Sequence, residues 1–329
     1  ILGRKEEAGE YRALADRQWQ EVRREYFTST GRCAVKTQTG LLLALKYHIS
    51  SDEEKTRQML KKLLRDSGNK LNTGFVGTPL LCNVLTDNGM TDAAYRLLLN
   101  EEYPGWLREV KLGATTIWER WNSLGEDGKV SSTGMNSFNH YAYGAILEWM
   151  FRHVGGIDVR ENAPGAKTVR IAPKVHADVK SAEAVYDSAS GTYRCGWEIL
   201  DDNRIRVSLE VPFGAEAEVQ LPYADTSVYL DESNPLFASV RDGVCHVKAG
   251  SYRAEYPASE QLEEDLQHRV KHGGTSESSR CPGVSVDSDR GGYDSGRGYP
   301  MSLRTVAEVF GGGGDEEQFQ MLDAALAKF

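Results

Sequence analysis

The sequence lacks the marks of a membrane protein and of a nucleic-acid-binding protein. No apolar stretch approaches the ~18 residues that a membrane span needs, and the apolar run at 41–45 ends at Lys46. Thirty-nine basic against 48 acidic side chains give a formal net charge of −9. A nucleic-acid backbone requires concentrated positive charge instead. We therefore expect neither a membrane nor a nucleic acid as a partner.

Cysteine and two well-known hydrolase motifs are also scarce or missing. The five cysteines are odd in number, widely scattered and without the paired spacing of a zinc site, which indicates reduced, buried thiols. This pattern favours a cytoplasmic location without fixing it. Neither G-x-S-x-G nor H-E-x-x-H occurs. The chain starts at Ile1 with no signal-peptide pattern, so we expect a processed chain or a piece of a longer protein.

Residues 1–157 have the apolar spacing of helices. Tyr11, Ala15, Trp19, Val22 and Tyr26 recur in steps of three or four, which places them on one face of a helix over 6–26. Capping residues and similar spacing predict further helices over 38–49, 52–64, 78–86, 91–99 and 139–154. Six helical segments with short connections indicate hairpins wound side by side.

The period changes from about 3.6 to two after residues 161–165. Apolar side chains at 205, 207, 209 and 211 alternate with polar ones, as in a half-buried strand. Further strands are predicted at 168–171, 192–199, 217–221, 227–230, 245–247 and 252–256, with a hairpin turn at 188–191. Residues 158–256 are thus predicted to form an antiparallel β-sandwich. We expect a disordered linker over 257–301 and a small helical tail over 302–329.

The densest chemical cluster is Trp118-Glu119-Arg120-Trp121. A carboxylate between two indoles has an environment that can tune its pKa, and Arg120 is placed to hold Glu119 ionised, as a general base requires. Indole faces also suit the C–H faces of sugars. The alternative interpretation is that both tryptophans are core residues and that Glu119 and Arg120 form a solvated ion pair on a helix.

Two further segments carry candidate residues. Ser137 or Asn139 can cap the last predicted helix, which puts His140 in its first turn as a neutral hydrogen-bonding group. A capping segment with a packed histidine is the alternative. Residues 73–79 combine two glycines with Pro79 before an apolar helix, which predicts a tight turn. A phosphate site there is disfavoured, because no lysine occupies the P-loop position.

Together these segments resemble the bacterial α-L-rhamnosidases, which are inverting six-hairpin glycoside hydrolases with an (α/α)6 barrel. The matching segments occur in family order at 37–39, 73–78, 88–95, 103–106, 113–121 and 135–144. Pro164-Gly165 and residues 171–173 then lead into the C-terminal β-sandwich. The resemblance covers residues 11 to 223 and makes residues 1–157 a portion of the catalytic barrel.

The resemblance implies hydrolysis of terminal α-L-rhamnosyl bonds in a rhamnose-containing glycoside or oligosaccharide. Glu119 takes the place of the general base and His140 that of a sugar contact. Trp106, Trp118 and Trp121 are weaker candidates for the walls of a sugar pocket. The implied two-carboxylate mechanism requires neither a metal nor a cofactor.

The sequence departs from the family in one respect. An inverting enzyme needs a general acid as well as a base, and the family's upstream Asp- and Glu-rich acid segment is absent, as are half of the helices of a complete barrel. We expect a missing N-terminal half, self-association through exposed apolar faces, and no hydrolysis by this chain alone. A non-catalytic carbohydrate-binding or scaffolding half-barrel and an (α/α)6 enzyme for another sugar are the alternatives.

Overall fold

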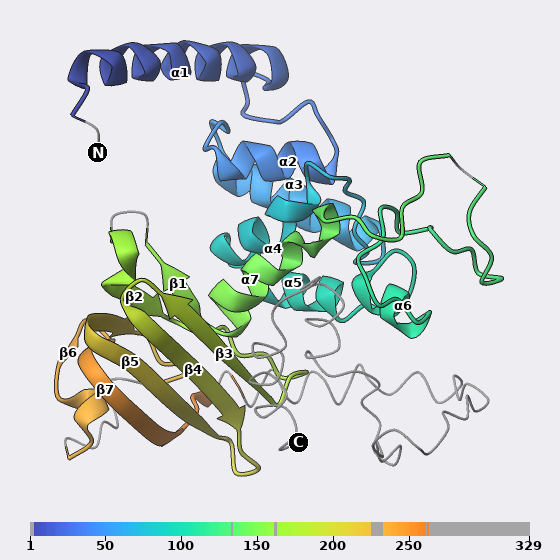
Figure 1. Ribbon diagram of the computed structural model, residues 1–329. Helices are drawn as coiled ribbons and strands as arrows, with labels where there is room; N and C mark the ends of the chain where they lie inside the picture. Colours follow the sequence, from blue (N-terminus) through green and yellow to red (C-terminus); the bar gives the residue numbers. More distant parts are fainter. Residues whose placement is uncertain (1–2, 133, 161–162, 225–232, 261, 263–329) are drawn as a thin grey trace. The chain divides into compact units, whose positions relative to one another are not determined.

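The computed structural model describes residues 3–132, 134–160, 163–224, 233–260 and 262 of the 329-residue chain. The chain divides into two compact units, one up to Leu147 and one from Glu148 onward. The first consists of helices and loops, and the second is built on a β-sheet (Figure 1). The predicted strand at 227–230, almost all of the predicted linker and the predicted helical tail lie outside the described residues.

The helical segments follow the predicted pattern closely. The α-helices of the first unit are α1 (Lys5–Tyr26), α2 (Gln38–Lys46), α3 (Glu53–Asp66), α4 (Thr78–Asp87), α5 (Thr91–Leu98) and α6 (Trp106–Lys111). A final segment changes type along its length, from the 3-10 turn η1 (Ala142–Ala145) to α7 (Ile146–Trp149) and the π-helix η2 (Met150–Val154). It begins at Ala142 instead of residue 139, and α6 was not predicted.

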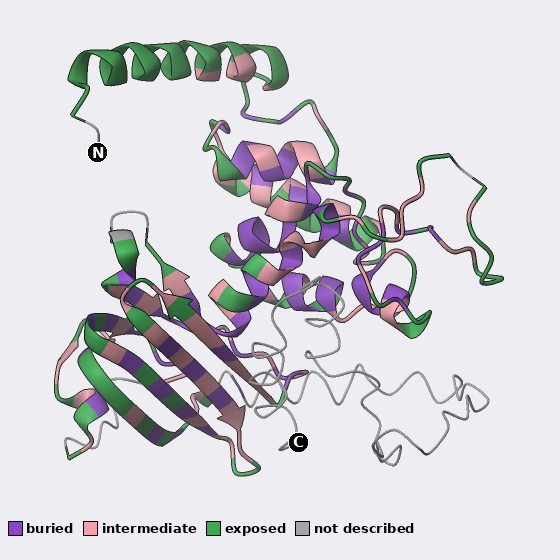
Figure 2. Ribbon diagram, viewed as in Figure 1, coloured by how far each residue is buried: buried purple, intermediate pink, exposed green. Residues whose placement is uncertain are grey.

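Helices α2 to α5 form the core of the helical unit. Helix α2 begins after Thr37, whose side chain accepts the Gly40 N–H, and most of its apolar run at 41–45 is buried. Helix α3 buries a single stripe that includes Leu60 and Leu64 and leaves its other faces to solvent (Figure 2). Helix α2 packs against α3 and α4, and α4 packs against α5.

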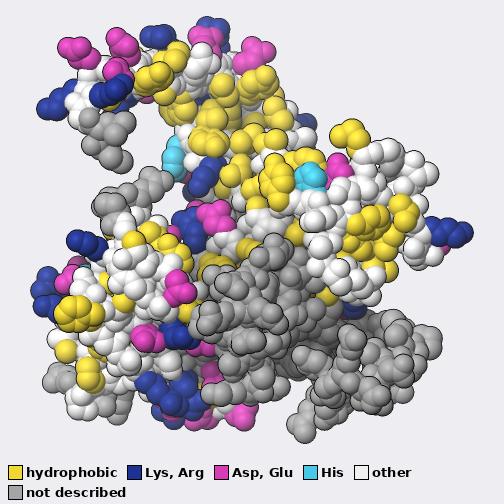
Figure 3. All heavy atoms as spheres, viewed as in Figure 1, with side chains coloured by type: hydrophobic (Ala, Val, Ile, Leu, Met, Phe, Trp, Pro, Cys, Tyr) yellow, Lys and Arg dark blue, Asp and Glu magenta, His cyan; other side chains and the backbone are white. Residues whose placement is uncertain are grey.

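Helix α1 forms as predicted, but its apolar face is not buried. None of its residues is buried, and Tyr11 is 70% exposed, because no described element covers this face. The helix is joined to the unit near its C-terminal end, where Trp19 Nε1 donates to the His48 carbonyl at 3.0 Å and Arg23 Nε to the Ile49 carbonyl at 2.8 Å. In Figure 3, hydrophobic side chains gather over the region of α1 and α2.

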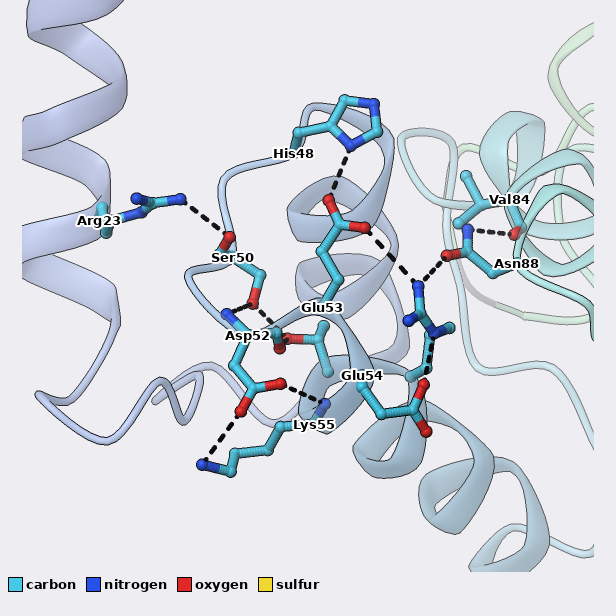
Figure 4. A network of polar contacts seen from close by, with 11 residues as sticks. Arg23, His48, Ser50, Asp52, Glu53, Glu54, Lys55, Val84 and Asn88 are labelled. Atoms are coloured by element: carbon cyan, nitrogen blue, oxygen red, sulfur yellow. Dashed lines mark hydrogen bonds and ion pairs between the residues drawn. The ribbon is translucent and has the colours of Figure 1, made fainter.

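A polar network holds the start of α3 (Figure 4). The Asp52 side chain accepts the Lys55 N–H at 2.9 Å, which confirms that the acidic run at 52–54 marks a helix N-terminus. Arg57 pairs with Glu54 on the same helix at 2.9 Å and reaches Asn88, at the end of α4, at 3.4 Å. The network thereby ties α3 to α4 through side chains.

The second unit contains one seven-stranded sheet in the described residues. Its strands are β1 (Ile157–Val159), β2 (Thr168–Ile171), β3 (Ser181–Ser188), β4 (Gly191–Ile199), β5 (Arg204–Val219), β6 (Val240–Arg241) and β7 (Val244–Pro257). The order is β1-β2-β5-β4-β3, with β7 also paired to β5 and β6 to β7. Strands β2 and β5 are parallel, and the other pairs are antiparallel.

The structure joins strands that the sequence suggests are separate. The predicted strands around 205–211 and 217–221 are parts of β5, and those at 245–247 and 252–256 are parts of β7. Pro212 suggests that the strand ends there, because proline cannot donate a hydrogen bond to a neighbouring strand. Strand β5 nevertheless continues through a shift of register between Val211 and Glu216. Phe213, within this shift, is 97% exposed. Strands β1, β3 and β6 were not predicted, whereas the 188–191 hairpin turn is confirmed.

Alternation of buried and polar residues builds the core of the sheet. Ile205, Val207, Leu209 and Val211 are at most 3% exposed, as the predicted period of two requires. Trp197 of β4 is also buried, and its indole N–H donates to the Val154 carbonyl of η2 at 2.7 Å. The four described cysteines, Cys33, Cys82, Cys195 and Cys245, are buried free thiols, as predicted, while Cys281 lies outside the described residues.

Candidate active site

Glu119 and His140 are brought together by two extended segments of the helical unit. Residues 113–121 are irregular and not helical. They run beside the segment before η1, where the Glu119 N–H donates to the Ser137 carbonyl at 2.9 Å and the His140 N–H to the Ile117 carbonyl at 2.8 Å. These backbone bonds fix the two candidate residues on neighbouring stretches of chain.

The Glu119 carboxylate is half-buried and oriented by the backbone. The Ser137 N–H donates to its Oε2 at 2.8 Å, and Oε1 has no hydrogen-bond partner within the described part of the chain. The prediction that Arg120 holds this carboxylate is wrong. The Arg120 guanidinium donates instead to the carbonyls of Met135 at 2.8 Å and Gly134 at 3.3 Å. A backbone amide, and not a cation, therefore sets the direction of the Glu119 carboxylate.

His140 precedes the final helical segment and does not sit in its first turn. Its Nδ1 accepts the Ala142 N–H at 3.3 Å, so the ring itself, instead of Ser137 or Asn139, holds the first backbone donor of that segment. An acceptor at Nδ1 leaves Nε2–H as the donor of the neutral ring. The imidazole is therefore a neutral hydrogen-bond donor whose tautomer is set by the backbone.

Two aromatic rings that the sequence did not single out flank His140. The Phe75 ring stacks on the imidazole with centroids 4.8 Å apart, and the Tyr141 ring stacks with centroids 5.2 Å apart. Phe75 is 47% and Tyr141 87% exposed. Phe75 comes from the turn at 73–79, which forms as predicted: a Cβ on Gly77 would meet the Thr39 Oγ1 at 2.3 Å, so only glycine fits there.

The three candidate tryptophans lie beneath this site and are buried. Trp106 has 0%, Trp118 4% and Trp121 8% of its surface exposed. Trp121 stacks on Tyr143 at 4.0 Å, and Trp106 packs edge-on against Trp121 at 5.2 Å while its indole N–H bonds the Tyr143 carbonyl. Trp118 packs edge-on against Phe138. The indoles thus form the packed support of the two extended segments.

One further carboxyl lies in this region, and no signal in the sequence marks it. Glu109 of α6 is 0% exposed. Burial raises its pKa to about 8, against the opposing effects of the Trp118 backbone amide and the Arg108 charge. Burial and the nearby Glu109 charge raise the pKa of the Tyr143 phenol. Since α6 itself was not predicted, the sequence could not place Glu109 under the site.

The described residues contain neither a metal-binding cluster nor a membrane-spanning helix. Among them, no cluster of three or more His, Cys, Asp or Glu side chains has an arrangement that could hold a metal ion. None of the helices in the described ranges combines the length and apolar character needed to cross a bilayer.

A helical unit followed by a sheet unit matches, in this order, two domains of the six-hairpin glycosidase class. Residues 1–154 match the model of the bacterial α-L-rhamnosidase six-hairpin glycosidase domain. Residues 156–234 match the model of the bacterial α-L-rhamnosidase C-terminal domain. The chain therefore belongs to the bacterial α-L-rhamnosidase family, glycoside hydrolase family 78.

Individual relatives agree with this assignment. An α-L-rhamnosidase of Formosa agariphila is 39% identical over 246 residues, which are 73% of this chain and 26% of that protein. The crystal structure of Streptomyces avermitilis α-L-rhamnosidase complexed with L-rhamnose matches with a TM-score of 0.68 and 35% identity, over 76% of this chain and 24% of that one. The crystal structure of the Aspergillus terreus α-L-rhamnosidase matches with a TM-score of 0.67 and 30% identity, over 78% of this chain and 28% of that one. The chain spans about a quarter of the length of the curated relatives it matches.

Proposed function

We propose that this chain carries the general-base side of the active site of an inverting α-L-rhamnosidase. The observation that supports this role most directly is the Glu119 carboxylate. One oxygen is fixed by the Ser137 N–H, and the other has no partner among the described residues. A general base needs this combination, because its orientation must be fixed while one oxygen stays free for a water proton.

In the proposed reaction, Glu119 Oε1 takes a proton from a water molecule as that water attacks the anomeric carbon. Attack comes from the face opposite the departing oxygen, so the configuration inverts. The leaving oxygen is protonated by a second carboxyl, which in inverting enzymes lies roughly 6.5–9.5 Å from the base. We assign this acid to a segment outside the described residues.

His140 is proposed to bind the sugar as a neutral donor. Its Nε2–H is the donor that the Ala142 contact at Nδ1 leaves for a ligand. Sugar contact by Trp106, Trp118 and Trp121 stays a prediction that their burial does not favour. We propose instead that these indoles support the Glu119 and His140 segments. The helical unit is proposed to be part of an (α/α)6 barrel, and the sheet unit a β-sandwich.

The Glu119→Gln variant tests the base directly in a protein that carries the proposed acid as well as this chain. With an aryl α-L-rhamnoside as substrate, kcat is expected to fall by about 10²–10⁴-fold, the usual contribution of a general base. Glu126→Gln is the matched control, because Glu126 is exposed and lies in the loop between the two extended segments. It is expected to leave kcat unchanged. Equal loss in both variants, or no loss at Glu119, would contradict the assignment.

Chemical rescue then separates catalysis from binding. In Glu119→Ala, azide needs no general base and is expected to displace the aryloxide from the same face as water, giving the rhamnosyl azide of inverted configuration. A wild-type protein that binds L-rhamnose but cleaves no rhamnoside would indicate a carbohydrate-binding half-barrel. If a panel of aryl glycosides showed cleavage of a different sugar, the chain would still belong to a glycoside hydrolase, but its substrate would not be a rhamnoside.

A further inference from the structure

The Phe75 ring is half-exposed in the 73–79 turn, and contacts other than this ring anchor the turn. The side-chain hydroxyls of Thr73 and Thr78, both buried residues, share a hydrogen bond of 2.8 Å. The Trp121 indole N–H donates to the Thr73 carbonyl at 3.4 Å, so the turn is also tied to the buried aromatic residues. The Phe75 backbone therefore has a fixed place, from which its ring can hold another group.

The group that the Phe75 ring contacts is the imidazole of His140. The two rings stack with their planes inclined by only 16° and their centroids 4.8 Å apart. The Tyr141 ring is also nearly parallel to the imidazole, at an angle of 12° and a centroid distance of 5.2 Å. Stacked aromatic pairs have a preferred geometry, so each neighbouring ring favours one plane for the imidazole.

The hydrogen bond at Nδ1 leaves part of the imidazole orientation open. The Ala142 N–H donates to His140 Nδ1 at 3.3 Å, which is a long hydrogen bond. It sets the tautomer of the ring, but a single bond leaves the ring free to tilt about the line that joins the two nitrogen atoms. Stacking restricts this tilt, so the direction of Nε2–H depends on the neighbouring rings.

Phe75 connects the imidazole to the buried aromatic residues, which Tyr141 does not. The Phe75 ring also packs against Tyr143, with centroids 5.4 Å apart and a tilt of 55°. Tyr143 is buried and stacks on Trp121. Tyr141 is 87% exposed and adjacent to His140 in the chain, so it has little packing of its own to hold it in place. The orientation of the imidazole is thus tied to the core through Phe75.

We propose that Phe75 is a positioning residue, whose ring sets the plane of the His140 imidazole and thereby directs Nε2–H toward the sugar. The part of this inference that concerns the sugar rests on the proposed function of His140. Glu119 is held separately, because its carboxylate accepts the Ser137 N–H. Loss of the Phe75 ring is therefore expected to weaken sugar binding more than it slows the activation of water.

Two substitutions of Phe75 separate stacking from apolar packing, in a protein that carries the proposed acid as well as this chain. Phe75→Leu keeps an apolar side chain but removes the ring. With an aryl α-L-rhamnoside it is expected to raise KM by about three- to tenfold and to leave kcat within about twofold of wild type. Phe75→Tyr keeps the ring and is expected to keep KM within about twofold of wild type. Phe213→Leu, the same change at an exposed ring of the sheet unit, is the control.

The NMR signal of the His140 ring gives a second measurement that does not depend on activity. A proton above an aromatic face resonates upfield, so the His140 Cε1–H signal of the full chain is expected to move downfield in Phe75→Leu and to stay near wild type in Phe75→Tyr. Loss of the signal in His140→Gln identifies it. An unchanged signal in Phe75→Leu, or equal KM values in the Leu and Tyr variants, would overturn the proposal. A downfield shift in a protein that cleaves no rhamnoside would support positioning by Phe75 while contradicting the proposed enzyme.

Discussion

At the scale of single residues, the Glu109 carboxyl couples stability to pH. Its pKa is about 8 in the folded chain, against 4.5 for an unperturbed glutamate, chiefly because burial disfavours the charged form. Below pH 4.5 both the folded and the unfolded chain hold this proton. Between the two pKa values only the folded chain holds it, so stability declines as the pH rises through that window.

The Glu109→Gln variant is therefore expected to have a smaller dependence of stability on pH than wild type. Glutamine cannot ionise, so the variant lacks the decline of up to about 1.4 kcal/mol per pH unit that one proton contributes between pH 4.5 and 8. Urea unfolding of both proteins at pH 5, 6.5 and 8 measures the difference. A free-energy difference that stays constant over this range would contradict a buried, neutral Glu109.

The identities of single residues predict part of the candidate site and leave out the rest. Glu119 and His140 stand out because a carboxylate between indoles and a histidine beside capping residues are visible in the sequence. The hydrogen bonds that orient them come from backbone groups such as the Ser137 N–H, which leave no mark on residue identity. Phe75 was missed for a related reason, since it stacks on His140, a residue distant in the chain. Glu109 was missed because the short helix α6 that carries it was not predicted.

At the scale of secondary-structure elements, Gln38 joins the start of α2 to the chain before the 73–79 turn. It is 2% exposed, its Nε2 donates to the Lys70 carbonyl at 3.0 Å, and its Oε1 accepts the Asn72 N–H at 2.7 Å. Two backbone groups of a segment without regular structure thus find their partners on one buried amide. These two hydrogen bonds of Gln38, here called the Gln38 clamp, help to set where the turn that carries Phe75 begins.

The Gln38→Leu variant is expected to lower the free energy of unfolding by about 1–3 kcal/mol, because the Asn72 N–H loses its partner and the Lys70 carbonyl loses a donor. Gln58→Leu makes the same change at an exposed position of α3 and is expected to stay within about 0.5 kcal/mol of wild type. Urea denaturation measures the free energy of unfolding of both variants. An unchanged m-value would show that a shift of the midpoint reports a change in stability. Similar effects of the two substitutions would mean that the clamp does not stabilise the fold.

Element prediction succeeds where packing repeats along the chain and fails where it does not. The periods of 3.6 and two locate α1 to α5 and the alternating part of β5, because one face of each meets solvent or a core regularly. The six-residue α6 is too short to show a period. The continuation of β5 past Pro212 depends on pairing with β7, a tertiary contact that local residues do not encode.

At the scale of the whole molecule, the compact units divide at a different place from the change in sequence pattern. The apolar period changes after residues 161–165 and the predicted boundary lies at residue 157, but the compact units separate after Leu147. The π-helix η2 contacts the sheet, since Trp197 Nε1 donates to the Val154 carbonyl and the Lys174 N–H to the His153 carbonyl, both at 2.7 Å. A helical pattern therefore continues into a unit whose core is a sheet.

Two fragments of the sheet unit distinguish these boundaries, one over 148–262 and one over 158–262. The shorter fragment loses the buried side chains of Val154 and Ile157, and with Ile157 it loses one of the three paired residues of β1. It also loses the acceptor of the buried Trp197 indole N–H. Unpairing that donor alone is expected to destabilise the fragment by about 1–3 kcal/mol. We therefore expect the longer fragment to unfold cooperatively at a clearly higher urea midpoint. Tryptophan fluorescence follows this unfolding through Trp197 in both fragments, with Trp149 contributing in the longer one. Equal midpoints would show that η2 contributes nothing to the sheet and would place the boundary at residue 157.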